Sequence, residues 1–277
     1  MTESATRSDY GIETPGHILR RFDIDVIEIN TGKRTAQMSM SLRDLTNPFT
    51  DLPAMGPLAI LVDAVGGLVN HFWHEAHEWT VSSELAIELS PDASERATAP
   101  EAPPVLAVAK TLGPRSSTSL SLCELRCGQA VIGSATVRSY FIPPDNVVLA
   151  ELRDDLTKTE RTGLADLMAV EPVARSDQMR VLRQRRDAFL DNAIGVVNGG
   201  VASAALELVA SAAMHRPGIP MWTSSLRVNF LRPFLSGAAS RYEGSPVRLG
   251  RGSAVCDARA VGDDGKTSLT ARVTAYR

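Results

Sequence analysis

An internal repeat constrains the fold of this 277-residue chain more than any other feature of its sequence. Residues 56–66 align with residues 200–210 at an offset of 144 (207 − 63). Each segment is a glycine and an apolar run, with one carboxylate seven residues after the glycine, Asp63 in the first copy and Glu207 in the second. Because repeated segments of this kind mark a structural unit that occurs twice, we expect two related halves.

Further matches extend the repeat through both halves. The Trp-Thr pair at 79–80 resembles the pair at 222–223, and residues 135–140 match residues 271–276. The offset falls from 144 to 136 (271 − 135), as expected if a few surface loops differ in length between the copies.

The periodicity of each half predicts one helix and several strands. Residues 58–72 carry apolar side chains around nearly the whole helical circumference, which is typical of a helix buried on most sides. Strands are expected in β-rich runs bounded by turn residues, namely 22–29, 80–89, 105–112, 117–125 and 130–141. The second half repeats this pattern, with a helix at 201–214 and strands at 180–186, 224–231, 239–246, 253–261 and 267–276. Each half is therefore expected to be an α+β unit whose curved antiparallel sheet wraps a single helix.

This pattern divides the chain into an N-terminal unit at 1–142, a connector at 143–171 and a C-terminal unit at 172–277. The connector is charged and helix-prone. Residues 90–104 contain four prolines and are expected to be a loop.

Composition excludes several classes of protein. The net charge of −3 lacks the basic surplus that is typical of a nucleic-acid partner. The first 16 residues contain no apolar core of a signal peptide, and no apolar run approaches the length of a membrane span. Three cysteines in such a chain are expected to be reduced thiols. We therefore expect a cytoplasmic protein with no membrane or nucleic-acid partner.

Familiar catalytic motifs are also missing from the sequence. It contains no Gly-x-Ser-x-Gly elbow and no Gly-x-Gly-x-x-Gly after a strand. His71 and His74 could share one helical face, but His77 is rotated away and no cysteine or aspartate cluster accompanies them. We therefore expect no metal site.

Asp63 and Glu207 are notable because each is the lone charge in an apolar helix. Burial of an unpaired carboxylate is costly unless the charge is paired or neutralised. For one such residue, a wet groove or a local hydrogen-bond network is as good an explanation as a functional role. Two acids at the same position of a repeat favour a site.

The start of the second helix has the composition of an oxyanion site. Asn192 and Asn198 precede Gly199 and Gly200, and glycines at a helix start leave backbone N–H groups approachable. Such a terminus can polarise a carbonyl group. Taken alone, residues 198–200 are better explained as an N-cap and a turn.

Together these residues resemble the hotdog-fold acyl-CoA thioesterases, in particular the phenylacetyl-CoA thioesterase-like branch. That branch has an Asn, a His-Gly-Gly six residues later, and an acid eight residues after the first glycine. Asn192, residues 198–200 and Glu207 keep these spacings, with Asn198 in place of the histidine. The resemblance covers both halves and implies a double hotdog, in which two antiparallel sheets, each wrapped around a central helix, pack side by side.

The resemblance also implies two sites, because members of that family take the glycine loop from one hotdog and the acid from its neighbour. The catalytic site is expected to use Asp63, Asn192, Asn198, Gly199 and Thr80. A second site, impaired because Met55 replaces the first glycine, is expected to use Glu207, Asn47, Met55, Gly56 and Thr223. Substrate-binding roles are expected for Gly200 and Arg251.

The activity implied is hydrolysis of acyl-CoA thioesters, with no cofactor beyond the coenzyme A of the substrate, in a homo-oligomer. The Gly199 amide polarises the carbonyl, while Asp63 activates water or attacks directly. Six arginines could bind the phosphates of coenzyme A or could simply be solvated residues at a strand edge, namely Arg175, Arg180, Arg183, Arg185, Arg186 and Arg251.

Two alternatives remain on the same fold. An enoyl-CoA hydratase is disfavoured because no histidine follows either acid by five residues. A non-catalytic acyl-CoA binding protein is favoured by the missing histidine and by Met55.

Overall fold

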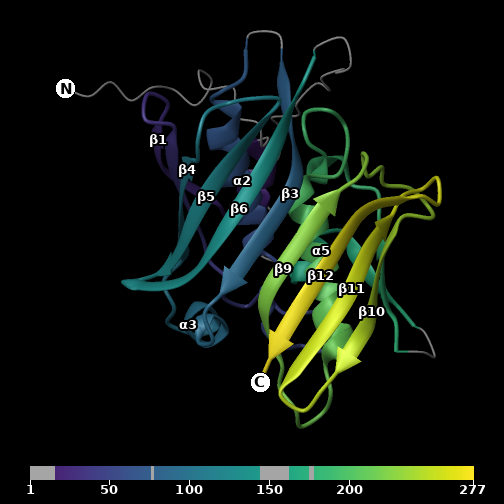
Figure 1. The fold of residues 1–277 in the computed structure, drawn as a ribbon. Coiled ribbons are helices and arrows are strands. Elements are labelled where there is room, and N and C mark those ends of the chain that lie inside the picture. Colours follow the sequence, from purple (N-terminus) through teal and green to yellow (C-terminus); the bar gives the residue numbers. More distant parts are fainter. Residues whose placement is uncertain (1–15, 76–77, 144–161, 175–177) are drawn as a thin grey trace.

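The computed structural model describes residues 16–75, 78–143, 162–174 and 178–277 (Figure 1). The two long helices are α2 (Leu58–His71) and α5 (Gly199–Met214), which pack against each other and against the sheet. A single antiparallel sheet of twelve strands curves around both helices. The core of each half is therefore a helix enclosed by strands, as the repeat predicts.

The strand order shows the repeat directly. Six strands of the first half come in the order β1 (Asp25–Asn30), β2 (Thr35–Met40), β4 (Val105–Thr111), β5 (Thr118–Cys127), β6 (Ala130–Ile142) and β3 (Trp79–Leu89). Six strands of the second half continue the sheet in mirrored order, namely β9 (Trp222–Phe230), β12 (Thr267–Tyr276), β11 (Ser253–Val261), β10 (Arg241–Leu249), β8 (Arg180–Gln184) and β7 (Val170–Val173).

The two halves join where β3 pairs with β9. Leu85 lies opposite Val228 and Ile87 opposite Leu226, and all four side chains are buried. The α+β class with one helix wrapped by each antiparallel set of strands is confirmed. The predicted side-by-side packing takes the form of one continuous sheet, because the strand at the inner edge of each half supplies the hydrogen-bonding partner that the other lacks.

The beginning of each half differs from the sequence prediction. The strand expected at 22–29 starts at Asp25, because Asp23 has a positive φ of 49° that ends the short helix α1 (Gly16–Arg21). Ala169 has the same φ of 49° after α4 (Leu164–Leu167) and before β7. The structural repeat thus includes α4 and β7.

The unit boundary expected at residue 172 consequently falls inside β7. This strand lies at the sheet edge and has four residues, one of them Pro172, so it is too short for its sequence to show strand periodicity. Residues 144–161 of the expected connector lie outside the described residues. Within the expected loop at 90–104, residues Ala93–Thr98 form α3, and β2 has no counterpart among the predicted strands.

Glycines allow α5 to approach the sheet closely. A Cβ on Gly244 of β10 would lie 2.5 Å from the carbonyl oxygen of Val209 and 3.0 Å from the amide nitrogen of Ala210. Both contacts are with helix backbone, which cannot move aside as a side chain can. The helix therefore sits on β10 at a distance that only glycine permits.

We expect Gly244→Ala to lower the free energy of unfolding by about 1 to 3 kcal/mol, because the added methyl group forces the helix and the strand apart. Urea denaturation measures this change. Gly163→Ala is the matched control, since no atom of the described residues other than its chain neighbours lies within 4 Å of its Cβ position and its φ is −58°. Equal midpoints for the two variants would contradict the expectation.

Candidate active site

A cavity of about 370 Å³ opens between the two halves. The first half contributes the start of β3 and the end of β6, and the second half contributes the start of α5, the loop before it, and the end of β9. Most of its lining is apolar, and four aromatic residues take part, namely Trp79, Tyr140, Phe230 and Phe234. An apolar group of moderate size therefore fits this space.

Asp63 lies in this cavity and is held by both halves. It projects from the middle of α2 and is 7% exposed. Its Oδ1 accepts a hydrogen bond of 2.8 Å from the Ser82 hydroxyl, and its Oδ2 accepts one of 2.8 Å from the Gly200 amide. Burial raises the pKa of Asp63, while these two hydrogen bonds oppose the rise. The carboxylate is thus fixed in orientation and made more basic.

The N-terminus of α5 presents one free amide to the same cavity. Asn198 caps the helix, because its Oδ1 accepts a hydrogen bond of 3.1 Å from the Val201 amide. Gly200 donates to Asp63, whereas the Gly199 amide donates to no other residue in the described part of the chain. A Cβ on Gly199 would lie 3.1 Å from Asp63 Oδ2. An unused donor at a positive helix end therefore lies beside a buried carboxylate.

Asn192 lines the cavity from the loop that precedes α5. Its Oδ1 accepts hydrogen bonds from the amides of Ile194 and Val196, which folds the loop tightly. Its Nδ2 donates to no residue that the structure describes. The side-chain amide is consequently available to a bound molecule.

Comparison with known proteins identifies the fold of the chain and a superfamily match in its second half. Residues 194–269 match the family model of the thioesterase superfamily. The tesB protein of Mycobacterium avium subspecies paratuberculosis is 11% identical with a TM-score of 0.62, over 95% of this chain and 98% of that one. The chain has the fold of a double hotdog protein. The resemblance to the thioesterases is thus confirmed in fold for both halves and in sequence for residues 194–269, while the branch stays a prediction.

Two further solved structures share the fold of the double hotdog protein. The acyl-CoA thioesterase II TesB2 of Mycobacterium marinum is 12% identical with a TM-score of 0.60, over 94% of this chain and 97% of that one. A hotdog-fold protein of unknown function from Alicyclobacillus acidocaldarius is 13% identical with a TM-score of 0.50, over 94% of this chain and 97% of that one. A search of curated proteins finds no match.

The structure brings Asp63, Asn192, Asn198 and Gly199 together but leaves Thr80 out. Thr80 is fully buried and its hydroxyl lies 2.8 Å from Nδ1 of His71. Ser82 takes the place expected for Thr80, because Ser82 and Thr223 each directly precede a β-bulge. The Trp-Thr pairs that match in the sequence therefore do not coincide in the structure, where the counterpart of Thr223 is Ser82, two residues after Thr80. Both candidates lie on the same face of the strand, so alternation alone cannot separate them.

Gly200 and Arg251 are also not part of the cavity lining. A Cβ on Gly200 would lie 2.7 Å from the Cα of Ile60, so this glycine permits the contact between α2 and α5 and holds Asp63. Arg251 lies in the turn between β10 and β11.

The cation at the cavity is instead Arg232, an exposed residue that follows β9. Its structural counterpart in the first half is Pro91, because the Ser90 and Leu231 amides donate to the equivalent carbonyls of Ile132 and Ser268.

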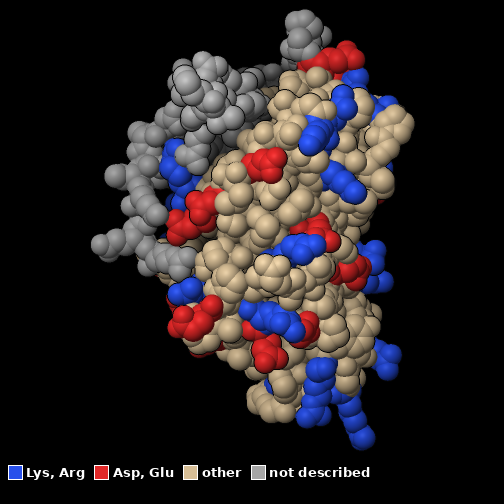
Figure 2. Space-filling view, turned by 90° about the vertical axis from the view of Figure 1, so that its left-hand side faces the viewer, with Lys and Arg blue, Asp and Glu red and all other residues tan. Residues whose placement is uncertain are grey.

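The other expected arginines have mostly structural partners. Arg183 pairs with Glu171 at 2.8 Å and Arg185 with Asp166 at 3.4 Å. Arg175 lies outside the described residues. On the face shown in Figure 2, acidic and basic side chains are interspersed over most of the surface. Exposed pairs of this kind contribute little to stability.

The second site is nearly closed in the double hotdog protein. Glu207 is 2% exposed, its Oε1 accepts a hydrogen bond of 2.5 Å from Thr223, and its Oε2 has no hydrogen-bond partner among the described residues. Burial raises the pKa of Glu207, opposed first by the Thr223 hydroxyl. The cavity there has about 20 Å³, room for about one water molecule.

Two features close this second site. Asn47 donates from Nδ2 to the Leu208 carbonyl at 2.8 Å and to the Ser211 hydroxyl at 3.0 Å, so its amide is used by α5. Met55 lies where Gly199 lies in the open site and lines the remaining space. A Cβ on Gly56 would lie 2.9 Å from Glu207 Oε2, so the helix start still meets the acid. The contact between helix start and acid is therefore repeated in both halves, but the site at Glu207 lacks the large cavity found at Asp63.

His71, the last residue of α2, and the nearby His74 form a packed pair. His71 and His74 stack with ring centroids 3.9 Å apart, and burial and the neighbouring His74 lower the pKa of His71 to about 4. His77 lies outside the described residues. Across those that are described, no group of His, Cys, Asp or Glu has the geometry of a metal site.

The described helices contain none that is both long and apolar enough to cross a membrane.

The burial of Asp63 predicts that Asp63→Asn raises the free energy of unfolding at pH 7. A raised folded-state pKa contributes stability below the unfolded pKa of about 3.9, and this contribution is lost as the pH rises through the folded value. The amide removes the charge and retains hydrogen-bonding groups for Gly200 and Ser82. Thermal unfolding at pH 4 and pH 7 measures the effect, and the gain over wild type is expected to be larger at pH 7.

Asp25→Asn is the control for this experiment, because Asp25 is exposed on the edge strand β1. Its stability is expected to stay within about 0.5 kcal/mol of wild type. A loss of stability in Asp63→Asn at pH 7 would show that the ionised form is stabilised by its surroundings, contrary to the argument.

Proposed function

We propose that the double hotdog protein hydrolyses acyl-CoA thioesters at one site per chain, the cavity that holds Asp63. The observation that carries this proposal is the meeting of a buried, oriented carboxylate with an unused helix N-terminal amide. Thioester hydrolysis needs both groups, one to activate water and one to stabilise the oxyanion. Membership of residues 194–269 in the thioesterase superfamily supports it.

In the proposed reaction the thioester carbonyl accepts a hydrogen bond from the Gly199 amide. The helix end favours the negative charge that develops on this oxygen. Asp63 takes a proton from water as the water oxygen attacks the carbonyl carbon. The tetrahedral intermediate then collapses, the carbon–sulfur bond breaks, and the leaving coenzyme A thiolate takes the proton that Asp63 received from water. Direct attack by Asp63, followed by hydrolysis of the resulting anhydride, remains the alternative use of the same carboxylate.

The cavity also suggests how the substrate lies. Its deep end is made of buried apolar side chains from the second half, namely Val197, Ala202, Phe234 and Leu269. Its rim includes the exposed residues Tyr140, Leu231 and Arg232. The acyl group would occupy the deep end, where it leaves water, and a phosphate of coenzyme A would lie near Arg232.

Asp63→Asn is expected to lower kcat/KM for acyl-CoA hydrolysis by about 100- to 10,000-fold, the contribution typical of a general base. Glu207→Gln is the matched variant and is expected to retain wild-type turnover, because its site is closed. Release of free coenzyme A, detected with a thiol reagent over a panel of acyl chains, measures both. Equal losses in the two variants would contradict the assignment of one site.

The wild-type protein separates the alternatives in the same panel. Acyl-CoA binding without release of coenzyme A at any chain length would identify a binding protein instead. A change in absorbance of an enoyl-CoA would identify a hydratase.

The rate of hydrolysis is expected to fall as the pH falls through the raised pKa of Asp63, since only the ionised carboxylate accepts a proton. Ser82→Ala removes a hydrogen bond that favours the ionised form, so the acid limb of kcat/KM should move to higher pH. Thr80→Val is the control, because the Thr80 hydroxyl contacts His71 and not Asp63. A shift in Thr80→Val with none in Ser82→Ala would reverse the assignment.

A further inference from the structure

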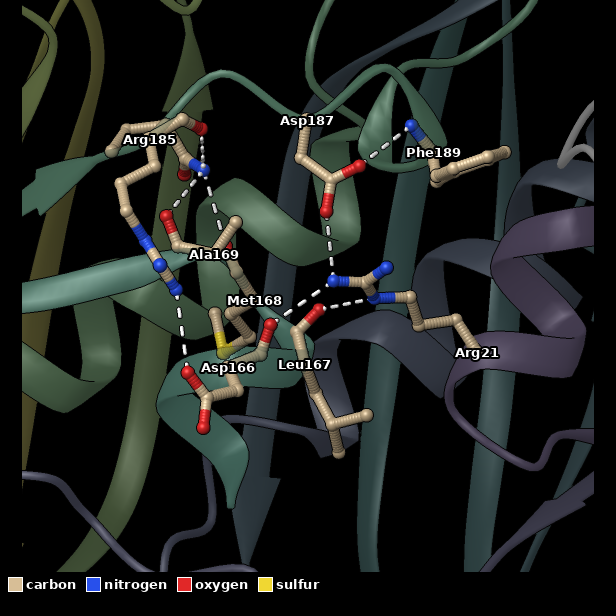
Figure 3. A network of polar contacts seen from close by, with 9 residues as sticks. Arg21, Asp166, Leu167, Met168, Ala169, Arg185, Asp187 and Phe189 are labelled. Atoms are coloured by element: carbon tan, nitrogen blue, oxygen red, sulfur yellow. Dashed lines mark hydrogen bonds and ion pairs between the residues drawn. The ribbon is translucent and has the colours of Figure 1, made fainter. Parts of the chain in front are cut away.

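We propose that Arg21 is a positioning residue for the active cavity, acting from the first half on the loop of the second half that carries Asn192 and Asn198. This inference rests on the proposed function. It starts from a partly buried network of polar contacts around Arg21 (Figure 3).

Arg21 is the last residue of α1, and its side chain is 13% exposed. Its guanidinium has three acceptors, all from the second half. Nε donates to the Leu167 carbonyl at 2.7 Å, and Nη2 donates to the Asp166 carbonyl at 3.0 Å and to Oδ2 of Asp187 at 2.8 Å. A planar fork of donors suits such a set of acceptors, and a lysine cannot reach them all at once.

Asp187 transmits this contact to the loop. Its second oxygen, Oδ1, accepts a hydrogen bond of 3.0 Å from the Phe189 amide and so caps the short helix η2 (Ala188–Leu190). Figure 3 shows Asp187 between Arg21 and Phe189. The side chain of His17, also in α1, lies 3.2 Å from the Asp191 carbonyl. Helix α1 thus holds the segment that enters the loop at two points.

The loop that follows η2 forms one wall of the cavity. It is a small hairpin in which Asp191 pairs with Val197 and the Asn198 amide donates to the Leu190 carbonyl at 2.8 Å. Five of its residues line the cavity, namely Asn192, Ile194, Val196, Val197 and Asn198. A shift of η2 would therefore move the two asparagines and the start of α5 relative to Asp63, which belongs to the other half.

The repeat provides an internal comparison for this contact. The Leu190 amide donates to the Asp187 carbonyl just as the Leu45 amide donates to the Leu42 carbonyl, so Leu42 is the counterpart of Asp187. Leu167 is the counterpart of Arg21, since each lies two residues before a position with φ of 49°. Both leucines are buried.

The nearly closed site thus has leucines where the open site has an ion pair. Apolar residues suffice for packing at this place, and a buried ion pair is in general weak evidence for stability. The difference favours a role in fixing the loop of the open site, because hydrogen bonds with defined directions restrict a loop more than apolar contact does.

The test compares kcat and KM of acyl-CoA hydrolysis in Arg21→Gln and Arg21→Lys, together with hydrogen exchange of the Val197 and Asn198 amides. Arg21→Gln is expected to lower kcat by about 10- to 100-fold, as a displaced catalytic geometry does, with a smaller change in KM. Exchange of the two amides is expected to accelerate. Arg21→Lys is expected to recover part of kcat, because its ammonium group can still pair with Asp187.

Arg272→Gln is the matched control, since Arg272 forms an exposed ion pair with Asp257 on β11. It is expected to leave kcat and exchange unchanged. If Arg21→Gln does not fold, the double variant Arg21→Leu/Asp187→Leu, which copies the leucines of the other half, replaces it. It is expected to fold with reduced kcat.

Wild-type kcat in Arg21→Gln, or in the double leucine variant, would overturn the proposal. If the wild-type protein hydrolyses no acyl-CoA, the proposed function fails separately. Hydrogen exchange then decides alone: faster exchange of the Val197 and Asn198 amides in Arg21→Gln supports positioning of the loop, and unchanged exchange refutes it.

Discussion

The hydrogen bond from the Gly200 amide to Asp63 depends on how closely α2 and α5 approach. A side chain at Gly200 would collide with the backbone of α2 at Ile60, so the two helices can meet only at glycine. At that distance the N-terminus of one helix faces a carboxylate in the middle of the other. The cavity, the free Gly199 amide and the orientation of Asp63 all follow from this contact.

The repeat preserves that contact and alters what surrounds it. A Cβ on Gly56 would lie 2.7 Å from the Ala204 carbonyl, so glycine is also required where the start of α2 meets α5. The side chains around Glu207 differ, since Met55 and the bonded amide of Asn47 occupy the space that is open beside Asp63. Backbone packing is shared by both halves because the fold requires it. Whether a cavity stays open beside the acid depends on the surrounding side chains, which differ between the two halves.

The two buried carboxylates, Asp63 and Glu207, differ in how their oxygens are hydrogen-bonded. Both oxygens of Asp63 accept a hydrogen bond, whereas one oxygen of Glu207 has no partner among the described residues. Hydrogen bonds to both oxygens fix the orientation of a carboxylate, and at both acids hydrogen bonds oppose the rise in pKa that burial causes. This difference agrees with an active site at Asp63 and a structural role for Glu207.

The sequence by itself determined the repeat, the two central helices, most strands and the pair of acids, because periodicity and repetition depend on residues that are near one another in the chain. It also indicated the glycines at the start of α5 and the replacement of the first glycine by Met55 in the other half. Only the tertiary structure decided that Ser82 rather than Thr80 reaches Asp63, because both residues lie on the same face of β3 and the position of α2 along the strand places Thr80 at His71 and Ser82 at Asp63. It also decided that β3 and β9 join the sheets, that Arg232 borders the cavity, and that Arg21 reaches Asp187. Each of these contacts joins residues far apart in the chain, and no local pattern records the distance between them.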